Sequence, residues 1–97
     1  MASYAYESIT VADTAIGFTT SKITDSLSLY GHECREVVGT VETAPIRFKV
    51  DGGTPTTDEG HLLYVGDQVI CDGKDALKFR AIRQGSTSGV LKVTYSR

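Results

Sequence analysis

The stretch Ile46-Arg47-Phe48-Lys49-Val50 alternates apolar and cationic side chains without exception. Successive side chains of a strand point to opposite faces, so this period of two predicts a β-strand. Its three apolar members would face the core, and the two cations, Arg47 and Lys49, would face outward. This is the clearest strand signal in the chain, and it sets the fold class that the neighbouring segments then support.

Segments on both sides carry related signals. Val37, Gly39 and Val41 repeat at a period of two, which predicts a strand between Cys34 and Glu42. Segments that are rich in β-branched or aromatic residues, or that alternate, predict further strands at 4–11, 16–20, 68–71, 77–83 and 90–95, and residues 61–65 are apolar. Residues 25–29 fit either a loop or one helical turn.

Turn signals separate these strands. They occur at Asp13-Thr14, 43–45, Gly66-Asp67 and Asp72-Gly73, and the Gly-Ser-Thr-Ser-Gly run at 85–89 predicts a hairpin loop. Residues 51–60 form a longer surface loop. We therefore expect one all-β domain over residues 1–97, a small β-sandwich that is jelly-roll-like or immunoglobulin-like, with about seven or eight short strands. Residues 1–12 are either a strand of this domain or an arm that contacts a neighbouring subunit.

Size and charge exclude several function classes. The 97 residues and 10.4 kDa are the size of one domain. Ten Lys and Arg against twelve Asp and Glu give a net charge of −2, which does not suit a nucleic-acid-binding domain. The sequence has no apolar run long enough to cross a bilayer and no secretory signal at its start, so we expect no membrane partner.

The reactive residue types form no recognisable catalytic or metal motif. Cys34 and Cys71 lack zinc-ligand spacing, and we expect two reduced, buried thiols rather than a disulfide. His61 lies near Asp58 and Glu59 in the sequence, but there is no nucleophile elbow, and so small a domain has little room for a pocket. The 85–89 run lacks the lysine of a phosphate-binding loop, and the acids of residues 51–59 do not have EF-hand spacing. We expect no enzyme activity, cofactor or metal.

A binding function is the remaining class, and three features supply candidates for it. The cations Arg47, Lys49, Lys78, Arg80 and Arg83 would form a basic stripe if their strands pair, or they are simply solvated. The two tyrosines near the N-terminus either pack on the domain's own sheet or anchor an arm in a neighbour. The 51–60 loop is the third feature. The candidate partner-binding residues are Tyr4, Tyr6, Arg47, Lys49, Asp51, Thr54, Pro55, Asp58, Glu59 and Arg80.

Residues 44–56, followed by Gly60-His61-Leu62-Leu63 and Gly66-Asp67, resemble small virion structural proteins of tailed bacteriophages. The runs 79–83 and 85–95 are similar to the end of the same proteins, so the resemblance covers about residues 34–97. It implies a β-sandwich or jelly-roll-like unit that binds the capsid exterior as a decoration or cement protein, or that lies elsewhere in the head or tail. The implied partners are the major capsid protein or other virion subunits, and further copies of the chain in the particle. The implied location is the virion, assembled in the host cytoplasm, and no catalytic residue is implied.

A second resemblance competes with the first. Residues 46–56, with their Asp-Gly-x-x-Pro-Thr turn, also look like immunoglobulin-like modules appended to sugar-processing enzymes. That family implies a sandwich and a carbohydrate-binding or host-adhesion function. The chain departs from it, because Arg47 or Lys49 stands where an aromatic residue is usual, and because the chain has no Trp to stack on a sugar.

Overall fold

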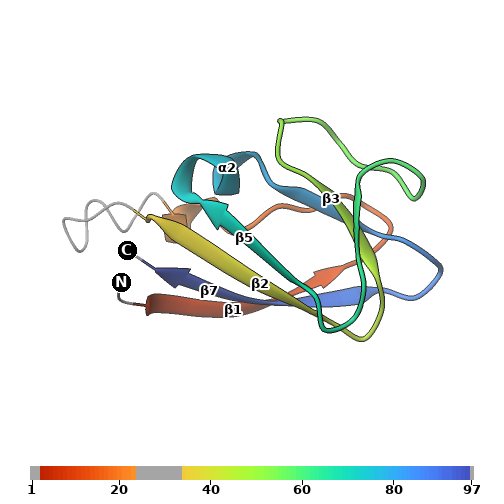
Figure 1. The fold of residues 1–97 in the computed structure, drawn as a ribbon, viewed down its shortest axis with the longest axis horizontal. Helices are drawn as coiled ribbons and strands as arrows, with labels where there is room; N and C mark the ends of the chain where they lie inside the picture. The colour runs from red at the N-terminus through yellow and green to blue at the C-terminus, as the bar shows by residue number, and fades with distance from the viewer. Residues whose placement is uncertain (1–2, 24–33, 97) are drawn as a thin grey trace.

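The computed structural model of the chain describes residues 3–23 and 34–96. Within these ranges there are seven strands and one complete short helix, and residues 20–23 are also helical. The elements are β1 (Ser3–Val11), β2 (Glu36–Glu42), β3 (Ile46–Lys49), β4 (His61–Leu63), β5 (Gln68–Asp72), α2 (Gly73–Lys78), β6 (Arg80–Arg83) and β7 (Gly89–Ser96). Figure 1 shows β1, β7 and β2 side by side along the long axis of the molecule.

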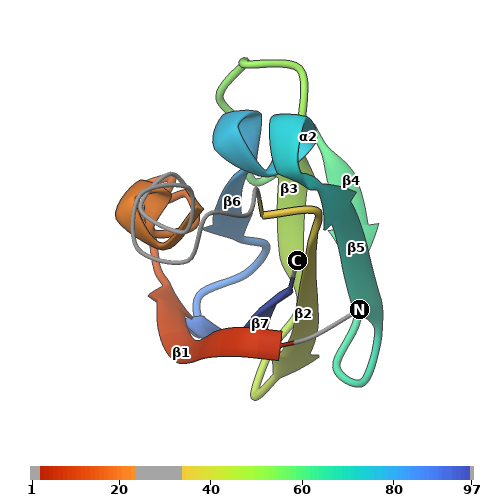
Figure 2. The same cartoon turned by 90° about the vertical axis from the view of Figure 1, so that its left-hand side faces the viewer.

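The strands form two antiparallel sheets. The larger sheet has the order β1-β7-β2-β5, and the smaller has the order β4-β3-β6. Figure 2 looks along the strands, with β1 and β7 on one side of the molecule and β3 and β6 on the other. The expected all-β domain of two sheets is therefore confirmed.

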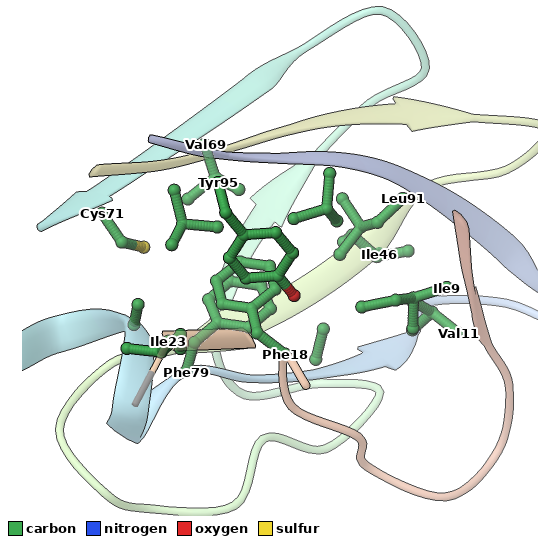
Figure 3. Packing of buried hydrophobic residues seen from close by; sticks show 14 of the residues in the cluster. Ile9, Val11, Phe18, Ile23, Ile46, Val69, Cys71, Phe79, Leu91 and Tyr95 are labelled. Carbon is green, nitrogen blue, oxygen red and sulfur yellow. The ribbon is translucent and has the colours of Figure 1, made fainter. Parts of the chain in front are cut away.

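The core lies between the sheets and is centred on β7. Leu91, Val93 and Tyr95 alternate along this strand, and all three side chains are buried. The Tyr95 ring points toward the rings of Phe18 and Phe79 (Figure 3), which stack with centroids 4.1 Å apart, while Tyr95 meets Phe18 edge-on at 6.3 Å. Both geometries are favourable for aromatic pairs, so these three rings join the layers of the domain.

The predicted strands at 4–11, 34–42, 46–50, 68–71 and 90–95 are all present, with shifted ends, and the apolar segment 61–65 contains the further strand β4. The N-terminal segment is a strand paired with β7 along its length. Ile46 is buried as expected, whereas Phe48 and Val50 are only partly buried. Cys34 and Cys71 are buried free thiols, which confirms the expectation for both. No helix among the described residues is long and apolar enough to cross a membrane.

The predicted strand at 16–20 is wrong. Ile16 makes a single bridge with Ala81, and the chain is helical from Thr20. A Cβ on Gly17 would lie 2.7 Å from the Phe79 carbonyl oxygen, so this segment crosses close over the chain at Phe79 instead of pairing along β6. The alternative interpretations of residues 25–29 lie outside the described residues.

The predicted turn at Asp72-Gly73 is instead the start of a helix. Asp72 is the N-cap of α2, and its Oδ1 accepts a hydrogen bond from the Asp75 N–H at 2.8 Å. The expected strand 77–83 is therefore reduced to β6, because Leu77 and Lys78 belong to α2. The buried positions of Phe79 and Ala81 are nevertheless as the alternating pattern predicts.

The 85–89 run is not a hairpin loop. It connects β6 of the smaller sheet to β7 of the larger sheet, so the two strands that it joins are not hydrogen-bonded partners. Gly66-Asp67 is a turn as predicted, and the Asp67 Oδ2 accepts from the Tyr64 N–H at 2.9 Å. It too joins the smaller sheet to the larger, because it lies between β4 and β5.

Candidate partner-binding surfaces

Arg47 fixes the loop of residues 51–60. Its Nε donates to the carbonyl oxygen of Thr57 at 2.8 Å, and its Nη1 donates to that of Gly60 at 3.0 Å. Two hydrogen bonds from one planar guanidinium hold the returning arm of the loop in a single orientation. The Arg47 charge is therefore used within the domain, and this residue orders the loop more than it presents a free cation.

The base of the loop is closely packed. Pro55 is one of the largest fully buried side chains, and a Cβ on Gly60 would lie 3.3 Å from the Pro55 Cβ. Gly60 has φ 131°, in the region where side chains are strained. Pro55 thus lies inside the domain, whereas Thr54 is exposed beside it.

The tip of the loop is a tight turn that displays two acids. The Thr56 Oγ1 accepts from the backbone N–H of Glu59 at 3.0 Å, and the Thr56 and Glu59 backbones also bond each other at 2.9 and 3.3 Å. Asp58 and Glu59 are exposed at this tip. The result is a pre-shaped, negatively charged projection from the smaller sheet.

Asp51 organises the start of the loop. Its Oδ1 accepts from the Gly53 N–H at 2.8 Å. That hydrogen bond lowers the pKa of the Asp51 carboxyl, and the nearby positive charge of Lys49 acts in the same direction. Asp51 is exposed, so it adds a third negative charge to the loop surface.

The predicted basic stripe forms only in part. Lys49 pairs with Arg80 across β3 and β6, so these two side chains share the outer face of the smaller sheet. Arg47 lies on that face as well but is bonded to the loop. Arg83 pairs with Ile46 and so belongs to the opposite face, and Lys78 lies on α2.

The two N-terminal tyrosines have different environments. Tyr4 packs against the core, and its hydroxyl donates to the carbonyl oxygen of Lys22 at 2.7 Å. Tyr6 lies on the outer face of the larger sheet with 59% of its surface exposed. Of this pair, only Tyr6 offers its ring to a partner.

A row of side chains crosses the outer face of the larger sheet. Tyr6 pairs with Thr94, Thr94 with Val38, and Val38 with Ile70, so one residue from each strand contributes. Ile70 is 63% exposed at the end of this row. Sequence reasoning missed Val38 and Ile70 as surface candidates, although the alternation of Val69 and Cys71 would have placed Ile70 on the other face.

Glu7 is an acid that faces the core. Its carboxyl group accepts hydrogen bonds from the Tyr95 hydroxyl and from the Thr19 Oγ1, the latter at 2.8 Å. Burial raises the pKa of Tyr95, and the hydrogen bond to Glu7 raises it further, so this phenol stays protonated as a donor. The three residues tie β1, β7 and the 18–20 segment together and form a structural contact.

The thiol of Cys71 is also unsuited to nucleophilic chemistry. Burial raises its pKa to about 11, and the negative charges of Asp75 and Asp72 act in the same direction. His61 is exposed, with its ring centroid 5.3 Å from that of Phe48. Among the described residues, no group of three or more His, Cys, Asp or Glu is placed to hold a metal ion.

Comparison with models of protein families, with curated proteins and with solved structures finds no match to this chain. The candidate surfaces are therefore defined by geometry. They are the acidic 51–60 loop, the Lys49 and Arg80 pair on the smaller sheet, and the row from Tyr6 to Ile70 on the larger sheet.

Proposed function

We propose that the chain is a non-enzymatic structural protein of a tailed-bacteriophage virion, and that it decorates and cements the capsid exterior. The observation that carries this proposal is the construction of the 51–60 loop. Within the resemblance to phage virion proteins, which covers about residues 34–97, the stretches 44–56 and 60–63 include β3, most of this loop and β4. The segment has a fixed shape, because Arg47 bonds the returning arm of the loop, Pro55 is buried at its base and Gly60 adopts a positive φ.

A pre-shaped loop suits an adhesive function. Its backbone is already bonded through Arg47 and Thr56, so a partner would not have to order it on binding. Asp58, Glu59 and Asp51 are exposed on it and would match a basic patch on a capsid subunit. The loop is therefore the surface that we assign to the capsid.

Cementing follows from preferential binding. A protein that contacts neighbouring capsid subunits across their junction binds the assembled shell better than free subunits. Mass action then stabilises the shell against dissociation by heat or chaotropes. A small domain is sufficient for this task, because a standard interface of about 1,600 Å² needs only part of its surface.

The proposal is tested by removing the chain from the particles and adding it back. Particles without the chain should release their DNA at a lower temperature than complete particles, and the purified chain should restore the difference. The affinity of the loop variant Asp58→Lys/Glu59→Lys for these particles should be lower by roughly tenfold or more, because its positive charges would repel the basic patch on the capsid subunit.

The matched control reverses two exposed acids elsewhere, Asp13→Lys/Glu42→Lys, with the same change in net charge. It should restore heat resistance like the unmodified chain. Equal heat resistance with and without the chain would contradict cementing. Equal weakening by the loop and control variants would contradict the assignment of the loop.

A further inference from the structure

The two sheets end in four edge strands within the described residues: β1, β5, β4 and β6. A strand edge presents unpaired N–H and C=O groups that can bond a strand of another chain, so proteins usually protect such edges. The four edges differ in this protection.

Three of the edges are protected over all or part of their length. The backbone of Ala81 in β6 bonds Ile16, and Arg80 and Arg83 flank it. β4 is only three residues long. β1 has an irregular register near its start, between Ser3 and Ala5.

The remaining edge, β5, has none of these devices. Its sequence is Gln-Val-Ile-Cys-Asp, without Lys, Arg or Pro, and its pairing with β2 is regular from Gln68 to Asp72. Ile70, at its midpoint, is the most exposed large apolar side chain among the described residues, at 63%. The centre of β5 therefore presents a regular, uncharged edge to which a strand of another chain can bond.

The backbone groups of β5 are oriented for further pairing. Val41 of β2 bonds toward β5 through both its N–H and its C=O, to Asp67 and Gly66 respectively. Antiparallel hydrogen bonding alternates along a strand, so Val69 and Cys71 bond β2 in the same way. The N–H and C=O of Ile70 therefore point away from β2, toward the free edge.

We propose that β5 pairs antiparallel with β5 of a second copy of this chain, about a two-fold axis at Ile70. Ile70 then lies opposite Ile70 of the second copy, and Val69 lies opposite Cys71. Gln68 lies opposite Asp72, so the Gln68 amide can donate to the Asp72 carboxylate, and no like charges face each other. This self-complementarity, which is a property of β5 itself, is the reason that the occupant is a second copy.

The same symmetry brings other exposed apolar residues together. Tyr64 and Val65 lie just before β5, and Leu77 lies on α2 just after it, and all three are exposed. Figure 1 shows α2 and the 64–67 turn at opposite ends of β5. Antiparallel pairing places the turn of each copy beside α2 of the other, so both ends of the contact gain apolar neighbours.

The paired sheets would also share one surface feature. The row from Tyr6 to Ile70 would continue through Ile70 of the second copy to Tyr6 on the far edge of a single eight-stranded sheet. This pairing does not depend on the virion function proposed above, because it requires only the chain itself.

The test is sedimentation equilibrium of the purified chain over a range of concentrations. The unmodified chain should show a monomer–dimer equilibrium with a dissociation constant below about 1 mM. Ile70→Lys should weaken the dimer roughly tenfold or more, because two like charges would replace an apolar pair. The matched control is Tyr6→Lys, which makes the same kind of change on the same face at the opposite edge and should leave the equilibrium unchanged.

Two further variants test the register. Ile70→Cys should form a disulfide-linked dimer under mild oxidation, because opposed Cα atoms about 5.5 Å apart allow the bond, whereas Tyr6→Cys should not. Gln68→Asp should weaken the dimer by placing two acids opposite each other, and it remains informative if Ile70→Lys fails to fold. Each of three results would overturn the proposal. They are a chain that is monomeric at about 1 mM, equal weakening of the dimer by Lys at residues 6 and 70, and no disulfide-linked dimer of Ile70→Cys.

Discussion

Tyr95 links the apolar core to Glu7, an acid that faces it. Its ring meets Phe18 edge-on, and its hydroxyl donates to Glu7 and accepts from the Thr19 N–H at 3.2 Å. The Thr19 hydroxyl completes the contact by donating to the other oxygen of Glu7. A buried polar group is stable only when its hydrogen bonds are satisfied, so these three residues depend on one another.

This contact predicts an alkaline loss of stability. Burial and Glu7 raise the pKa of Tyr95 above its ordinary value of 10.0, so the folded state retains a proton that the unfolded state releases. The stabilisation is complete below pH 10 and is lost as the pH rises above it, at up to about 1.4 kcal/mol per pH unit. Urea unfolding between pH 8 and 11 should show this slope above pH 10, in addition to the loss that begins near pH 9 from Cys71, whose pKa is raised from 9.0 to about 11.

Tyr95→Phe should have a shallower slope over the same pH range, because the substituted residue has no proton to lose. Its stability at pH 8 should be lower by roughly 1–3 kcal/mol, since the Glu7 carboxyl and the Thr19 amide lose a buried partner. Tyr6→Phe, on the exposed face, is the control and should match the unmodified chain at pH 8. An unchanged alkaline slope in Tyr95→Phe would show that another group causes the loss.

Helix α2 changes the direction of the chain between the two sheets. Asp72 ends β5 and caps the helix, and Ala76 is the buried residue of the helix itself. A Cβ on Gly73 would lie 2.1 Å from the carbonyl oxygen of Cys34, so only glycine fits where the helix begins. This close approach of two backbones holds α2 beside the start of β2.

Gly73→Ala should therefore destabilise the domain. The methyl group must displace either α2 or the backbone at Cys34, and we expect a loss of about 2–4 kcal/mol in the free energy of unfolding. Gly85→Ala is the matched control, because a Cβ there meets nothing within 4 Å. It should be neutral or slightly stabilising. Equal urea midpoints for the two variants would refute this account of α2.

Local patterns were sufficient to predict most strands but not their partners. The alternation over 46–50 and 36–42 identified β3 and β2, because inward and outward positions differ in polarity. Asp72-Gly73 fits a turn and a helix start equally well in sequence, and only the contact with Cys34 decides between them. The 85–89 run could not reveal that its flanking strands join different sheets, because strand pairing depends on contacts far apart in the chain.

The candidate surfaces were predictable to a smaller extent. The 51–60 loop was found from its composition, but the burial of Pro55 and the bonding of Arg47 to the loop depend on tertiary contacts. Ile70 became a candidate only when β5 proved to be an edge strand. A surface is a property of which elements remain uncovered, and a sequence pattern alone does not contain that information.

The domain combines a closed core with two outward surfaces of different chemistry. The acidic loop projects from the smaller sheet, and the row ending at Ile70 crosses the larger sheet. In our account the loop binds the capsid and β5 binds a second copy. One chain could then link two positions on a shell, which strengthens attachment because the second contact is intramolecular.

We propose that this chain is a virion component that covers the capsid. The most direct measurement is quantitative mass spectrometry of purified particles, with the copy number of the chain expressed relative to the major capsid protein. Our account predicts a copy number comparable to that of the capsid protein and loss of the chain when the particles are stripped. A chain that is absent from particles, or present in only a few copies as in a neck or tail, would contradict it.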